Sequence, residues 1–192
     1  MAENNIGNVY TRIGVNPVIN ATANKTHLGG SNPAASVMRA MEEANQYYVH
    51  MDELMDRSGE FVARLLGVES AYITSGCAAA TMLSAAACIA GGDKDSIGRL
   101  PDTTGMKDEF VIFKKQHFFY DRYYEAPGGK LVWIGDEDGC SSADLSNAIG
   151  PNTAAVCYLI KGGTNLSESV PSIEETRWIA NDAGVPVIVD AA

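Results

Sequence analysis

From residue 69 onward the chain alternates short apolar runs with helical patterns, and this alternation constrains the fold more than any other feature. The apolar runs predict strands at 71–74, 110–114, 130–134, 154–160 and 186–190. The segments between them predict helices at 78–90, 119–126, 142–149 and 173–183. Alternation of this kind favours parallel strands joined by helical crossovers. We therefore predict an α/β fold with three α/β/α layers and a mostly parallel sheet, in which Ser172 and Glu175 form a capping box before the last helix.

Residues 1–68 follow a different pattern, which predicts an N-terminal arm carrying two helices ahead of the α/β unit at 69–192. Asn32 is expected to cap the first helix, with Pro33 at its first position. The second helix is expected at about 52–66, and Gly67 ends it.

Charge and composition exclude several classes of partner. The net charge is −10, and 14 basic residues are scattered among 24 acidic ones, so we expect no nucleic-acid partner. The longest apolar stretch, 78–90, is too short to span a bilayer, and the N-terminus lacks a signal pattern, so we expect no membrane association. The four cysteines show no C-x-x-C spacing, which argues against a metal site and favours a reducing, cytoplasmic setting.

The segment 72–81 (YITSGCAAAT) passes from a predicted strand through a Ser-Gly turn into an alanine-rich helix. Such a turn aims backbone N–H groups, at the positive end of the helix dipole, toward one point. Ser75, Gly76 and Cys77 therefore suit an anion such as phosphate. The alternative is a tight turn in which Ser75 caps the helix.

Three more polar residues follow predicted strands and are expected on the same edge of the sheet. Asp190 ends the last strand and would pair with a cation, or alternatively cap a following helix. His117 could stack on a flat ligand or move a proton, or be an ordinary hydrogen-bonded surface histidine. Asn165 could bind a phenolic or carbonyl oxygen, or simply form a turn. Together these groups suit a phosphorylated, flat heterocycle with a ring nitrogen.

Several segments in this order carry a family resemblance: 16–22 (NPVINAT), 26–30 (THLGG), 74–80 (TSGCAAA), the pair Gln116-His117, Asn165 seven residues before Ser172, and 189–192 (VDAA). With them the chain resembles the fold-type I pyridoxal-phosphate enzymes. Within these it is most similar to the branch that contains selenocysteine synthase and D-glucosaminate-6-phosphate ammonia-lyase. The resemblance covers essentially the whole chain and implies an incomplete, aminotransferase-like large domain.

The resemblance also implies roles for individual residues. Ser75, Gly76 and Cys77 would hold the cofactor phosphate. His117 would stack on one face of the pyridine ring and Ala192 would pack on the other.

Asn165 would bind the ring hydroxyl, and Asp190 would keep the ring nitrogen protonated. Thr26 and His27 would lie near a small-molecule substrate. The partner expected from the resemblance is a second copy in a homo-oligomer, or a complementary C-terminal chain.

The resemblance further implies a lysine that binds the cofactor aldehyde, about one strand beyond the aspartate. The chain ends two residues after Asp190, so we expect a fragment, the front portion of a larger enzyme, that is inactive by itself. The expected activity of the whole enzyme is that of a lyase that removes a Cα proton and eliminates at Cβ, on an amino acid or amino-sugar acid. The alternatives are a selenium transferase acting on seryl-tRNA, and a non-catalytic split or truncated subunit.

Overall fold

The structure is a computed structural model that describes residues 8–161 and 168–191. The chain divides into two compact units, Met1–Ala71 and Tyr72–Ala192, which are considered separately. Among the described residues, no helix is long and apolar enough to cross a membrane.

The N-terminal unit contains two single-turn 3-10 helices, Thr11–Ile13 and Thr26–Leu28, followed by α1 (Ala35–Ala44) and α2 (Met51–Leu66). The predicted cap at Asn32 is wrong, because the backbone is still extended at Ala34 (ψ 153°) and the helix begins after it. Gly67 ends α2 in a left-handed conformation with φ +68°, as expected.

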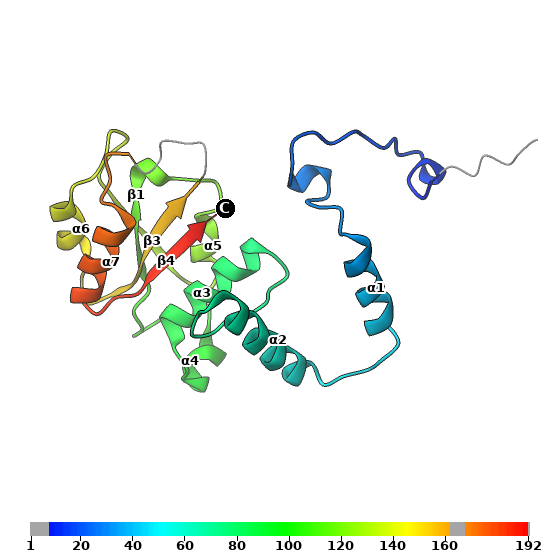
Figure 1. Cartoon of the computed structure of the whole chain (residues 1–192). Helices are drawn as coiled ribbons and strands as arrows, with labels where there is room; N and C mark the ends of the chain where they lie inside the picture. The colour runs from blue at the N-terminus through cyan, green and yellow to red at the C-terminus, as the bar shows by residue number, and fades with distance from the viewer. Residues whose placement is uncertain (1–7, 162–167, 192) are drawn as a thin grey trace, which may run out of the picture. The chain divides into compact units, whose positions relative to one another are not determined.

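In the C-terminal unit, the described residues form a four-stranded, fully parallel sheet with the order β2-β1-β3-β4. The strands are β1 (Glu109–Phe113), β2 (Lys130–Ile134), β3 (Thr153–Ile160) and β4 (Val187–Ala191). The helices are α3 (Cys77–Ala90), α4 (Lys94–Arg99), α5 (Arg122–Glu125), α6 (Ser142–Ala148) and α7 (Ile173–Asp182). Figure 1 shows α6 and α7 together on one side of the sheet.

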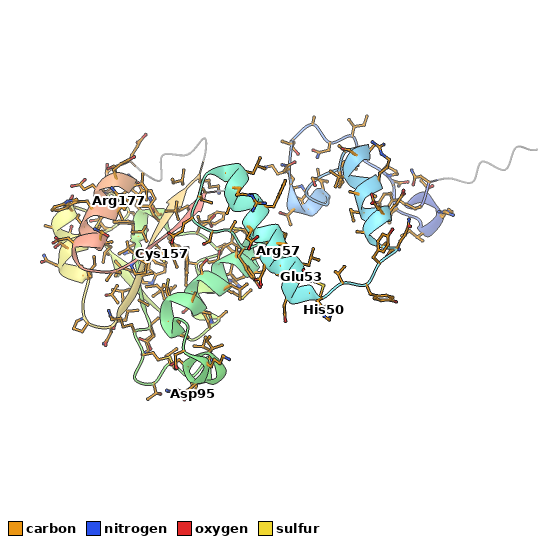
Figure 2. The ribbon with its side chains drawn as sticks, turned by 60° about the horizontal axis from the view of Figure 1, so that its bottom comes forward. His50, Glu53, Arg57, Asp95, Cys157 and Arg177 are labelled. Carbon is orange, nitrogen blue, oxygen red and sulfur yellow. The ribbon has the colours of Figure 1, made fainter. Side chains whose placement is uncertain are left out.

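Two apolar cores lie on the two faces of this sheet, because successive side chains of a strand point to opposite faces. Val111 and Phe113 of β1 belong to a core shared with α6 and α7, and Phe110 and Ile112 to a core shared with α3 and α5. The predicted three-layer α/β/α architecture is thus confirmed. Figure 2 shows the position of Cys157, a buried residue of the second core.

Three details of the sequence prediction are wrong. Residues 71–74 form no strand, since they pair with no neighbouring strand and the side chains of Tyr72 and Ile73 remain exposed. The polar connection expected at 91–109 contains α4, which Asp93 caps by accepting a hydrogen bond from the Ser96 N–H at 2.8 Å. The predicted helix at 119–126 contracts to the single turn of α5.

The capping box predicted at Ser172 is only half formed. The Ser172 hydroxyl accepts a hydrogen bond from the Glu175 N–H at 3.1 Å, but the Glu175 carboxylate pairs with Ser142 on α6 instead of closing the box. A complete box lies at the start of α6, where Ser141 and Asp144 bond reciprocally. The Ser142–Glu175 bond ties α6 to α7 and so fixes that helical layer.

Candidate functional site

The order of the strands places a ligand-binding position between β1 and β3. The connection that leaves β1 runs through α5 to β2 on one side, whereas the connection that leaves β3 runs through α7 to β4 on the other. Ligands of open α/β sheets bind beyond the carboxyl ends of the strands where such connections diverge.

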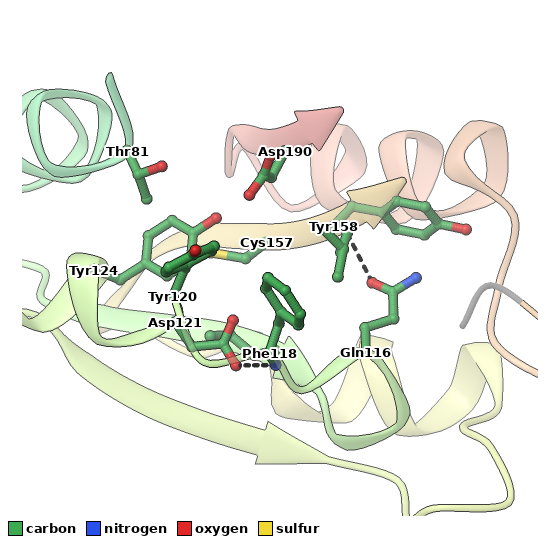
Figure 3. A pocket seen from close by; sticks show the side chains of 11 residues that line it. Thr81, Gln116, Phe118, Tyr120, Asp121, Tyr124, Cys157, Tyr158 and Asp190 are labelled. Atoms are coloured by element: carbon green, nitrogen blue, oxygen red, sulfur yellow. Dashed lines mark hydrogen bonds between the residues drawn. The ribbon is translucent and has the colours of Figure 1, made fainter. Parts of the chain in front are cut away.

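An opening lies at this position, at the carboxyl edge of the sheet (Figure 3). Its lining residues come from α3, from β1 and the segment after it, from α5, and from β3 and β4: Thr81, Ile112, Gln116, Phe118, Tyr120, Asp121, Tyr124, Cys157, Tyr158, Leu159 and Asp190. Its enclosed volume is about 20 Å³, room for about one water molecule, so a larger ligand would occupy the open mouth.

Helix α3 begins beside this opening and leaves backbone donors available. Gly76 is the residue before the helix, with φ +142° and no atom within 4 Å of the position a Cβ would take. No side chain in the described part of the chain caps the helix at this point, which leaves its first N–H groups for a ligand. The alternative role of Ser75 as the cap is therefore wrong, because Ser75 lies one residue too early.

The start of α3 and the end of β4 meet directly, although they are 113 residues apart in the chain. The Cys77 thiol donates a hydrogen bond to Asp190 Oδ1 at 3.7 Å. Burial and the nearby Asp190 charge both raise the pKa of the Cys77 thiol, so it remains protonated at neutral pH. The uncapped start of α3 and a carboxylate therefore lie next to each other at one edge of the sheet.

Gln116 supplies a further unsatisfied group on the lining of the opening. Its side chain is 2% exposed, and its Oε1 accepts a hydrogen bond from the Leu159 N–H at 2.9 Å. Its Nε2 is buried without a hydrogen-bond partner among the described residues. A buried amide donor left unpaired costs about 1–3 kcal/mol, so it calls for an explanation.

His117 lies next to Gln116 but points to the rim, with its side chain 64% exposed. Its ring packs edge-on against Trp133 of β2, with 4.9 Å between centroids. Its Nδ1 lies 2.7 Å from the carboxylate of Asp121. The structure thus brings His117 to the same edge as Cys77 and Asp190, although it does not line the enclosed part of the opening.

Two ionisable side chains that line the opening carry no charge at neutral pH. Tyr124 and Cys157 are buried, and burial is the main cause that raises the pKa of each side chain. The charges of Asp190 and Asp121 raise the pKa of Tyr124 further. Both side chains stay neutral at physiological pH, which leaves two carboxylates as the charged groups of the lining.

Four other site residues were predicted from the sequence. Asn165 and Ala192 lie outside the described residues. Thr26 and His27 form part of the 3-10 helix Thr26–Leu28 in the N-terminal unit, so their role near a substrate stays a prediction.

Sequence reasoning missed the contribution of Asp121. Its i,i+4 spacing from His117 was a signal for this contact, but the turn between them is not visible in the pattern of apolar residues.

Comparison with known proteins found similarity over nearly the whole chain. D-glucosaminate-6-phosphate ammonia lyase of Salmonella typhimurium is 33% identical over 96% of this chain and 51% of its own length. The 5'-C-glycyluridine monooxygenase-decarboxylase of a Streptomyces species is 34% identical over 95% of this chain and 47% of its own length. No protein-family model matches the chain.

A solved structure of a D-glucosaminate-6-phosphate ammonia-lyase superposes with a TM-score of 0.92 at 32% identity. The superposition covers 97% of this chain and 52% of that protein. The chain therefore spans about half the length of the relatives it matches.

Proposed function

The chain belongs to the fold-type I pyridoxal-phosphate-dependent enzymes, in the branch that contains D-glucosaminate-6-phosphate ammonia lyase, and from this premise we propose that the whole protein is a pyridoxal-phosphate-dependent lyase. The observation that carries the proposal is the contact between Cys77, at the start of α3, and Asp190, at the end of β4. It joins a site for an anion to a carboxylate that can pair with a cation, and the cofactor has a phosphate and a basic ring nitrogen.

The groups at this edge fit the cofactor chemically. The uncapped N–H groups at Gly76 and Cys77 would hold the phosphate, since a helix N-terminus favours negative charge. Gly76 gives an open cradle, where no side chain competes with the phosphate for space. The unpaired Nε2 of Gln116 is a donor for an oxygen of a bound molecule.

When bound, pyridoxal phosphate supplies an electron sink for a substrate carbon that loses a proton. Asp190 would hold a proton on the ring nitrogen, and its half-buried position strengthens that interaction compared with an exposed carboxylate. The Cys77 thiol would give up its contact with Asp190 and remain a neutral neighbour of the phosphate site.

The substrate class we propose is a 2-amino-3-hydroxy acid, which includes amino-sugar acids. Loss of the Cα proton and the Cβ hydroxyl releases water, and hydrolysis of the product then yields ammonia and a 2-oxo acid. The similarity to the ammonia lyase supports this class. The equal similarity to a monooxygenase-decarboxylase supports the shared cofactor more firmly than the reaction.

The test uses the whole protein, loaded with pyridoxal phosphate and offered 2-amino-3-hydroxy acids that include D-glucosaminate 6-phosphate. We expect stoichiometric ammonia and 2-oxo acid, and a loss of activity of about 100-fold or more in Asp190→Ala, with the fold retained. Asp182→Ala, at the exposed end of α7, is the matched control.

Two results would overturn the proposal. One is a folded wild-type protein that takes up no cofactor. The other is release of carbon dioxide with oxygen consumption in place of ammonia, which would favour the decarboxylase reaction instead.

A further inference from the structure

His117 and Asp121 form a close pair at the rim of the opening. His117 Nδ1 lies 2.7 Å from Asp121 Oδ2, and the same oxygen accepts a hydrogen bond from the Phe118 N–H at 2.7 Å (Figure 3 shows the second bond). The Asp121 side chain is only 14% exposed, whereas that of His117 is 64% exposed. The backbone therefore holds the carboxylate in place, and the carboxylate holds the imidazole.

The direction of this hydrogen bond determines where the proton of the imidazole lies. An ionised carboxylate can only accept hydrogen bonds. The Asp121 oxygen already accepts one from the backbone, so the proton between it and the ring must come from Nδ1. In the neutral ring this leaves Nε2 unprotonated, and no partner for Nε2 is recorded in the described parts of the chain.

One further contact restrains the ring, and another restrains the residue before it. Trp133 packs against it at an interplanar angle of 88°, and the preceding residue, Gln116, is anchored to β3 through the Leu159 N–H. Two features are unusual for an exposed surface histidine. The preceding side chain, Gln116, is buried and bonded to β3, and the carboxylate that contacts the His117 ring, Asp121, is shielded from solvent.

We propose that Asp121 is a positioning residue that fixes His117 as the Nδ1–H tautomer, so that Nε2 takes up and returns a proton at the substrate. The inference rests on the proposed function for its substrate, but the tautomer itself does not depend on a cofactor. One proton moves: the Cα–H bond of the substrate breaks and its electron pair stays on the substrate, the Nε2–H bond forms, and Asp121 stabilises the imidazolium until Nε2 gives the proton to the departing Cβ hydroxyl, which leaves as water.

Asp121 and Asp190 thus act on different groups although both line the opening. Asp190 contacts the thiol at the start of α3, whereas Asp121 contacts the imidazole. The division assigns one carboxylate to the cofactor and the other to the histidine.

The test is a ¹⁵N-correlated NMR spectrum of the protein labelled at its three histidines, recorded without cofactor at a pH where the rings are neutral. The His117 signals are identified by their loss in His117→Gln. We expect a protonated Nδ1 and an unprotonated Nε2 in the wild type. A wild-type His117 protonated at Nε2 would overturn the proposal, and this measurement requires only the assignment variant His117→Gln to fold.

Asp121→Ala sharpens the test because it removes the one carboxylate oxygen that contacts both His117 Nδ1 and the Phe118 N–H. We expect this variant to lose the fixed Nδ1–H form and to populate the Nε2–H form, with Asp138→Ala, at an exposed carboxylate, leaving the tautomer unchanged. An unchanged tautomer in a folded Asp121→Ala protein would contradict the proposal.

Turnover separates this inference from the proposed function. In the cofactor-loaded protein, Asp121→Ala should lower kcat by about 100-fold while the affinity for pyridoxal phosphate stays within about twofold. A normal kcat in that variant would sink the positioning role and leave the proposed function standing. Failure of the wild type to bind cofactor would refute the proposed function. The tautomer of His117 would still be decided by the NMR spectrum, which is recorded without cofactor.

Discussion

The two edges of the parallel sheet are both polar, but they differ in whether their polar groups have hydrogen-bond partners. At the amino edge, Asp108 is buried and accepts hydrogen bonds from Thr103 Oγ1 at 2.7 Å and Lys130 Nζ at 2.8 Å. At the carboxyl edge, α3 starts without a side-chain cap and Gln116 Nε2 is buried without a partner in the described residues. Asp108 at the amino edge therefore has its hydrogen-bond donors within the protein. At the carboxyl edge, donors remain without a partner among the described residues.

From this comparison we infer that unsatisfied polar groups are a better guide to the binding edge than the size of a cavity. The amino edge carries a hollow of about 490 Å³, lined by Thr104, Lys107 and Asn152 among others, whereas the enclosed space at the carboxyl edge is about 20 Å³. The larger hollow surrounds a carboxylate that is already neutralised by Lys130. We therefore propose that the polar groups of the amino edge stabilise the fold and that those of the carboxyl edge bind a ligand.

The largest expected effect is at the amino edge, where Gly128→Ala should destabilise the protein by about 3 kcal/mol. Gly128 has φ +103°, and an added Cβ would lie 2.2 Å from Pro101 O, so both the backbone and the packing resist a side chain. Urea unfolding measures the change. Gly150→Ala, where no atom lies within 4 Å of the new Cβ, is the control. Equal stability of the two variants would refute the tight packing of this edge.

Asp108→Asn should cost about 2 kcal/mol at pH 7, because the ionised form accepts from Thr103 and Lys130. Burial raises the pKa of Asp108, but the hydrogen bonds from Lys130 and Thr103 outweigh it and leave the pKa lowered. A lowered pKa stabilises the folded protein above the unfolded pKa of about 4, and this contribution disappears as the pH falls through the folded value.

The difference between wild type and Asp108→Asn should therefore shrink when urea unfolding is repeated near pH 3. Asp138→Asn, an exposed carboxylate, should stay within about 0.5 kcal/mol of the wild type at both pH values. A difference that persists unchanged in acid would show that Asp108 acts through packing and not through its charge.

A smaller effect is expected at the carboxyl edge, where Asp190→Asn should speed alkylation of Cys77 by roughly two- to fivefold at pH 8. Burial raises the pKa of Cys77 first and the Asp190 charge adds to it, so removing the charge increases the thiolate fraction. Peptide mass spectrometry after timed alkylation resolves the rate. Cys140, whose pKa is raised by burial and by Asp144 and Asp136, is the internal control and should keep its rate. An unchanged Cys77 rate would mean that the two residues are not adjacent.

Periodicity in the sequence was sufficient to predict the layers of the C-terminal unit. The apolar runs at 110–114, 130–134 and 154–160 coincide with β1, β2 and β3 within one residue. The strands β1 and β3 are mostly buried, whereas β2 is only partly buried. The run at 71–74 looked similar but forms no strand, since strand formation requires a neighbour that a single run cannot reveal.

The sequence also predicted that Cys77 and Asp190 would share an edge of the sheet, from the rule that parallel strands end on one side. It could not show the contacts that distinguish groups on that edge. The burial of Gln116 and the bond between His117 and Asp121 depend on the turn after β1, which leaves no periodic signal. The roles of these residues toward a cofactor remain proposals that binding measurements decide.

The most direct test of the account is protection of Cys77 by pyridoxal phosphate in the whole protein. Alkylation of Cys77 and Cys140 is followed by mass spectrometry with and without saturating cofactor, and cofactor binding is monitored by absorbance in the same samples. We predict that the bound cofactor slows alkylation of Cys77 at least tenfold and leaves Cys140 unchanged, because the proposed phosphate site adjoins the Cys77 thiol at the start of α3. Cofactor that binds while Cys77 reacts at its original rate would place the cofactor elsewhere and contradict the account.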